Sequence, residues 1–145
     1  EVFMWLDFFT ISGFMLACMI ALTVTLAALT SAAARLSSLV GGDGTFLQRF
    51  TELGYQYAPV AMVSLVIGLG GMLFDPIKET ALGMTGVQAV KGGLFLIGVL
   101  WSIWLGDRIL ARQGVRLSRR WLPLLPGLIG SIVVGICWWP AIFGL

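Results

Sequence analysis

The most distinctive chemical groups in this sequence are sulfur ligands in its first apolar stretch. Met15, Cys18 and Met19 have the spacing of one helical face, and thioethers and thiols are soft ligands that suit Cu(I). Methionine and cysteine in an apolar helix more often serve as packing residues, so we expect no metal site, with copper at this cluster as the alternative. Cys137 is equally isolated, and we expect Cys18 and Cys137 to be buried, structural and replaceable.

Residue types that are missing restrict the chemistry further. The sequence contains no histidine, so this chain supplies no histidine ligand to haem and no histidine proton shuttle. Its two cysteines are far apart, whereas iron–sulfur clusters need closely spaced cysteines. We therefore expect no cofactor bound through histidine or clustered cysteine, and we retain lipid or quinone as candidate ligands.

The carboxylates do not fall at the centres of the apolar stretches. Ion-coupled carriers and proton pumps need an ionisable group inside the membrane. No candidate nucleophile has a partner base that the sequence identifies. We therefore expect no catalytic activity of the chain's own, while passage of a neutral substrate stays open. The carboxylates expected near helix ends are Asp7, Glu52, Asp75, Glu79 and Asp107.

A row of arginines separates the last two apolar stretches. Arg108, Arg112, Arg116 and Arg120 recur every four residues, and Arg119 adjoins the last of them. The plainer interpretation is an anchor on anionic lipid headgroups, since each basic residue near the surface contributes about 1 kcal/mol. The alternative is docking of an acidic partner protein, such as an electron carrier. Nucleic acid is not an expected partner for a patch that lies against a membrane.

Small residues repeat at four-residue spacing in the same two stretches. Such stripes let helix backbones approach closely in lipid. One interpretation is contact within the chain's own bundle, and the other is docking onto a second membrane subunit, for which we expect one stripe to be used. The stripes are Gly98, Ser102 and Gly106, and then Gly127, Ser131 and Gly135.

The elements that must position these residues are helices that cross a membrane. Hydrophobic residues make up 59% of the chain and charged residues 11%, with a mean hydropathy of +0.98. Soluble domains carry about a quarter charged residues, and a membrane helix needs roughly 20 apolar residues. The sequence predicts an all-α polytopic membrane protein with one domain, residues 1–145, and four transmembrane helices in a bundle. Their expected limits are about 8–34, 53–74, 87–111 and 121–143.

Turn and charge signals indicate how these helices are connected and oriented. After the glycine-rich turn at 41–44, Thr45 or Thr51 is expected to begin the next helical stretch. Seven of the nine basic residues lie in the first and third connections, and only Lys78 and Lys91 lie on the other side. The positive-inside rule then predicts that the N and C termini lie outside the cytoplasm. Because the sequence begins at Glu1, close to a helix, we expect a processed or partial form of a longer chain.

One segment carries a resemblance to a known family. Residues 50–63, with Gly54-Tyr55 followed by Pro59, resemble an element of bacterial membrane-bound 4Fe-4S polyferredoxins. These proteins are related to quinol dehydrogenases of nitrate reduction and to maturation factors of nitrous-oxide reductase. The end of the chain, with Pro123 and Pro126 before its last helix, is similar to the carboxyl ends of the same proteins. The resemblance implies the carboxyl-terminal membrane part of an electron-transfer protein in a bacterial inner membrane.

The resemblance covers most of residues 46–145, but it rests on apolar and small residues. The cluster cysteines of the family are absent from this sequence, so no functional residue is carried over. Copper-resistance membrane proteins, with a basic loop after a lysine-containing helix (here 91–112), are similar to about the same extent.

These observations together favour a non-catalytic membrane subunit, or membrane domain, of a respiratory or photosynthetic electron-transfer complex. In such a complex the chain would pack helices and lipid and would contact quinone. Its expected partners are membrane lipids and other membrane subunits. The alternative function is transport or handling of copper or a small molecule.

Overall fold

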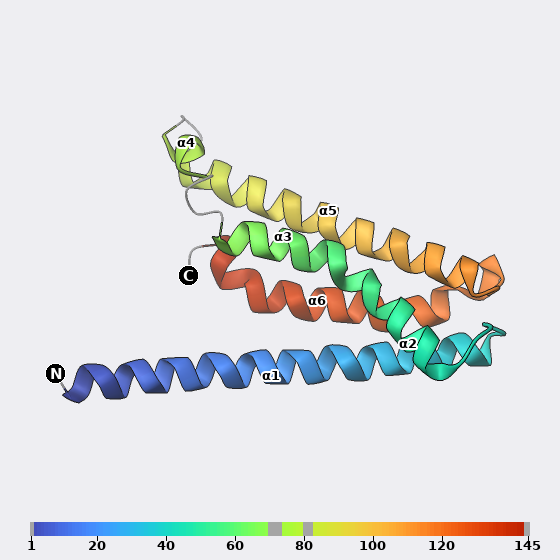
Figure 1. The fold of residues 1–145 in the computed structure, drawn as a ribbon. Coiled ribbons are helices and arrows are strands. Elements are labelled where there is room, and N and C mark those ends of the chain that lie inside the picture. Colours follow the sequence, from blue (N-terminus) through green and yellow to red (C-terminus); the bar gives the residue numbers. More distant parts are fainter. Residues whose placement is uncertain (1, 70–73, 80–82, 144–145) are drawn as a thin grey trace.

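The computed structural model describes residues 2–69, 74–79 and 83–143, and every regular element in these ranges is helical. Figure 1 shows long helices lying roughly side by side, with the start of α1 and the end of α6 toward the same end of the molecule. The elements are α1 (Val2–Leu39), α2 (Phe46–Gly54), η1 (Tyr55–Tyr57), α3 (Ala58–Leu69), α4 (Asp75–Lys78), α5 (Gly83–Arg112), η3 (Leu117–Arg119) and α6 (Trp121–Phe143).

Three of the described helices are long and apolar enough to cross a membrane. Their apolar spans are Thr10–Leu39 in α1, Gly83–Arg112 in α5 and Trp121–Pro140 in α6. In lipid, helices satisfy all their backbone hydrogen bonds within one segment. The chain is therefore a membrane protein that is helical throughout its described elements, as the sequence predicts.

The expected second span, 53–74, is divided rather than continuous. Its first residues belong to α2 and η1, and α3 contains only 12 residues, about 18 Å of helix. Residues 70–73, which the sequence places near the end of this span, lie outside the described residues. Because the described part of α3 is this short, the segment is not among the three spans found in the described residues.

Pro59 explains where the division falls. Proline has no N–H to donate, and its ring clashes with the carbonyl four residues earlier. That carbonyl belongs to Tyr55, and it instead accepts the N–H of Ala58 in the tighter pattern of a 3₁₀ turn. Pro59 is the second residue of α3 and therefore lies in the first turn of that helix, where a missing N–H costs little, while α2, which begins at Phe46, and η1 precede it along the same path.

The two halves of α1 have different surroundings. Thr30, Ala33, Ala34 and Ser37 are buried, and α1 contacts α2 and α6. Farther toward the N-terminus, the side chain of Phe14 is 70% exposed. Residues 10–20 of this helix are all exposed, so this stretch is available to lipid or to another membrane subunit.

The densest packing lies at the end of the molecule that holds the connections 40–45 and 113–120, here called the arginine end. Leu53, Leu110 and Val115 form a buried cluster there with two alanines of α1. Polar contacts reinforce this cluster, because Gln113 Oε1 accepts from the Ser37 hydroxyl at 2.8 Å and Gln113 Nε2 donates to Glu52 at 2.8 Å. These bonds tie the ends of α1, α2 and α5 together.

Arg49 contributes further hydrogen bonds to the arginine end. Its guanidinium is buried and donates to the backbone carbonyls of Ala34, Gly42 and Gly44. Thr45 caps the start of α2 by accepting the N–H of Gln48. The sequence predicted Thr45 or Thr51 at this position, and the structure selects Thr45.

Candidate ligand-binding cavity

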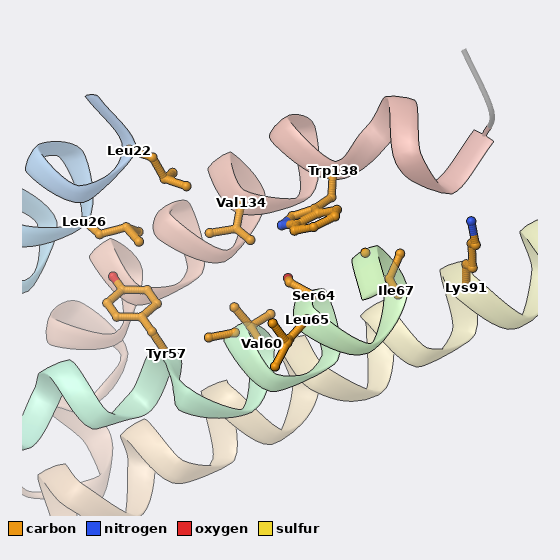
Figure 2. Close-up of a pocket in the computed structure, with 12 residues that line it drawn as sticks. Leu22, Leu26, Tyr57, Val60, Ser64, Leu65, Ile67, Lys91, Val134 and Trp138 are labelled. Atoms are coloured by element: carbon orange, nitrogen blue, oxygen red, sulfur yellow. The ribbon is translucent and has the colours of Figure 1, made fainter. Parts of the chain in front are cut away.

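A large cavity lies between α1, α3 and α6. Its volume is about 690 Å³, within the range of 300–1,000 Å³ typical of small-molecule sites. Leu22 and Leu26 of α1 form one wall, and Val134 of α6 forms another. Figure 2 shows these side chains facing the residues of α3 across the cavity.

Small residues on α3 leave the space open. Ala61, Ser64 and Gly68 line the cavity on the α3 side. A Cβ atom at Gly68 would lie 2.6 Å from the ring of Trp138, so glycine at this position lets the indole approach the backbone of α3. Trp138 thereby forms part of the cavity wall.

Three polar groups are distributed along this mostly apolar lining. The Ser64 hydroxyl is buried and has no hydrogen-bond partner within the described residues; in Figure 2 it points toward the side where Trp138 lies. The Tyr57 hydroxyl donates to the carbonyl of Pro126 at 3.4 Å. Lys91 lines the other end, with its ammonium 5.4 Å from the ring centroid of Phe74.

This arrangement suits a long apolar molecule that carries a hydrogen-bond acceptor. A buried hydroxyl without a partner destabilises the protein by about 1–3 kcal/mol, and a ligand acceptor would remove that penalty. The apolar walls can take a chain, while Ser64 offers a donor partway along it. The cavity also reaches the lateral surface, because Leu65 is 59% exposed although it lines the cavity.

The sulfur side chains considered above as copper ligands do not line this cavity. Met15, Cys18 and Met19 are all exposed on the first half of α1, and Cys137 is exposed on α6. The expectation that both cysteines are buried is therefore wrong, because each lies on a helix face turned away from the bundle. Within the described residues there is no group of three or more His, Cys, Asp or Glu side chains able to hold a metal ion.

The small-residue stripe of α5 faces the chain's own α2–α3 segment. A Cβ atom at Gly98 would lie 3.1 Å from Val63, and one at Gly106 would lie 2.6 Å from Oε1 of Gln56. Ser102 between them is buried. The chain therefore already fills this face with its own side chains.

The stripe of α6 is occupied in the same way. A Cβ atom at Gly127 would clash with Nε2 of Gln56, and one at Gly135 would lie 2.9 Å from Phe95. Ser131 is buried and donates to the carbonyl of Gly127 at 3.0 Å. These contacts remove the argument for placing a second subunit on either stripe.

The arginines divide into groups that the sequence did not distinguish. The helix α5 continues to Arg112, so Arg108 and Arg112 share one of its faces. A turn follows, and Arg116 and Arg119 are exposed beside or within η3. Arg120 turns back to Asp107 at 3.4 Å.

Tyr57 and Gln56 are buried contacts that the sequence analysis did not single out. The available signal was this pair of polar residues, separated from Pro59 by Ala58 and followed by an apolar run. Polar side chains at the start of such a run are expected to face other helices instead of lipid.

In comparisons with known proteins, no family model, curated protein or solved structure matches this chain. The fold and the cavity therefore define its class directly: a helical membrane protein with a lateral, mainly apolar cavity.

Proposed function

We propose that this chain is a non-catalytic membrane domain of an electron-transfer complex and that its lateral cavity holds an isoprenoid quinone. The observation that carries the proposal is the buried Ser64 hydroxyl, which lacks a partner within the described residues and lines an apolar space of about 690 Å³. A quinone carbonyl can accept a hydrogen bond from this hydroxyl. Leu22, Leu26 and Val60 offer apolar surface to the isoprenoid tail.

The proposed topology has four crossings, with α2, η1 and α3 acting together as one broken traverse. The arrangement of α1 and α6 supports an even number of crossings, because the start of one and the end of the other lie toward the same end of the molecule (Figure 1). The arginine end would face the cytoplasm of a bacterial cell, with both termini across the inner membrane. Partner subunits then have the exposed residues 10–20 of α1 available for contact.

The test of quinone binding uses two matched alanines of α3. Ala61 lines the cavity, whereas Ala58 is exposed one turn earlier and does not line it. Ala61→Leu should fill part of the cavity and weaken binding of a short-tailed benzoquinone about ten-fold, because overpacking costs about 1–3 kcal/mol. Ala58→Leu should leave binding unchanged.

Binding can be followed by quenching of tryptophan fluorescence, since Trp138 lines the cavity. Organic extraction of the protein after mild detergent purification gives an independent measurement, with quinone identified by mass spectrometry. Equal quinone content in the two variants, or phospholipid released in place of quinone, would reject quinone as the ligand. Co-purifying redox subunits would support the assignment to an electron-transfer complex.

A further inference from the structure

A second, smaller cavity lies at the arginine end, on the outer side of the bundle between α5 and the junction of α2 with η1. Its volume is about 290 Å³, and its lining combines Arg108 and Arg112 with Tyr55 and Glu52. Leu105 and Ile109 complete the wall on α5. The site is separate from the lateral cavity, with which it shares no lining residue.

The charge of this second cavity is positive. Within the described part of the chain, neither Arg108 nor Arg112 forms an ion pair. The Glu52 carboxylate is engaged inside the protein, where its two oxygens accept from Gln48 at 3.3 Å and from Gln113 at 2.8 Å. The lining therefore contains two guanidinium groups and one carboxylate, and that carboxylate already accepts two hydrogen bonds.

The apolar surroundings continue from this charged pair toward the membrane. The Arg108 guanidinium lies 5.2 Å from the ring centroid of Trp104, an attractive cation–π distance. Trp101 and Leu100, farther along the same helix, are 55% and 66% exposed. Tryptophan at such a position is typical of the membrane interface, with charge on one side and acyl chains on the other.

We propose that Arg108, Arg112 and Tyr55 bind the phosphate group of an anionic phospholipid. The two arginines provide charge-assisted donors for phosphate oxygens, and the Tyr55 hydroxyl adds a neutral one. The acyl chains then lie along the exposed face of α5 that carries Trp101. A ligand with a negative headgroup and an apolar tail contacts both the two arginines and the exposed apolar face of α5, whereas free phosphate contacts only the polar residues of the cavity.

The experiment compares two pairs of arginines in the full chain. Arg108→Gln with Arg112→Gln removes the charge of the cavity, and Arg116→Gln with Arg119→Gln removes the same charge from exposed positions outside it. Retained lipid is counted by native mass spectrometry after exchange into phosphatidylglycerol or into phosphatidylcholine. The wild type should retain phosphatidylglycerol preferentially, and the first pair should lower that retention about five-fold for each arginine removed.

The second pair and a Tyr55→Phe variant complete the design. The second pair should keep the preference for phosphatidylglycerol, and Tyr55→Phe should weaken it less than Arg108→Gln with Arg112→Gln does. Equal losses from both pairs would overturn the proposal, because they would indicate a diffuse surface attraction. Displacement of the lipid by inorganic phosphate, or loss of an acidic partner protein while the lipid is retained, would also overturn it.

Discussion

A Cβ atom placed on Gly130 of α6 would lie 2.6 Å from the hydroxyl oxygen of Tyr57 and 2.7 Å from its ring carbon Cε1. The tyrosine ring therefore packs directly on the backbone of α6, and its hydroxyl reaches the Pro126 carbonyl one turn earlier. This contact fixes the broken segment at η1 against α6. It also sets one end of the lateral cavity, which Tyr57 lines.

The first prediction concerns this contact. Gly130→Ala should lower the free energy of unfolding in detergent by about 1–3 kcal/mol, because a rigid buried ring must move to admit the methyl group. Gly92→Ala on α5 is the matched control, since a Cβ atom there meets nothing within 4 Å. The control should be neutral or slightly stabilising, because alanine favours a helix more than glycine does. Titration with sodium dodecyl sulfate measures both, and equal stabilities would contradict the prediction.

Ser64 gives a prediction that separates a ligand contact from a structural one. Its hydroxyl has no partner within the described residues, so Ser64→Ala should leave the stability of the ligand-free protein unchanged or raise it by about 1 kcal/mol. The same variant should bind benzoquinone less tightly. Denaturant titration and fluorescence quenching measure the two effects separately. A large loss of stability without ligand would show that the hydroxyl serves the fold.

Gln113 should be structurally important at the arginine end. Its side chain accepts from Ser37 and donates to Glu52, and Gln113→Leu should destabilise the protein by about 2–3 kcal/mol, because both partners lose a bond in a buried region. Gln48→Leu is the control, since Gln48 is exposed and donates to Glu52 at a longer 3.3 Å. Thermal unfolding in detergent should separate the two variants clearly. If Gln48→Leu proves as damaging, the network is not what stabilises this end.

The proposed orientation has a direct test. A reporter that is active only in the cytoplasm should be inactive when it is fused after Leu145, and active when it is inserted in the turn at 41–44. Both expectations follow from the arginines clustered at one end. Activity of the terminal fusion would reverse the orientation.

The apolar runs predicted limits close to those of two long helices, whereas α1 (Val2–Leu39) extends past both ends of the expected 8–34. The expected spans 87–111 and 121–143 correspond to α5 at Gly83–Arg112 and α6 at Trp121–Phe143. The break at η1 was not predicted: Thr45 was one of two expected helix starts, but no residue before Pro59 indicated that a 3₁₀ turn would separate the helix that begins at Phe46 from α3. Local composition cannot show that a polar segment continues a membrane helix.

The site residues were less predictable, because side-chain direction depends on packing between distant segments. The glycine stripes were visible, but only the structure shows that Gln56, Val63 and Phe95 fill them. The sequence showed the arginines as one row, whereas in the structure the turn after Arg112 separates Arg108 and Arg112 from the later arginines. The sequence analysis did not identify Ser64, because the lack of a partner for its hydroxyl follows from burial in the folded chain.

The lateral position of the larger cavity affects how a ligand reaches it. Its lining includes Leu65 and Leu26, from helices that both present apolar surface to the bilayer. A hydrophobic molecule can therefore enter by diffusing in the plane of the membrane, without passing through water. Occupancy then depends on the mole fraction of ligand in the lipid phase rather than on its aqueous concentration. A dissociation constant for this protein accordingly has physical meaning only when the amount of lipid or detergent is stated with it.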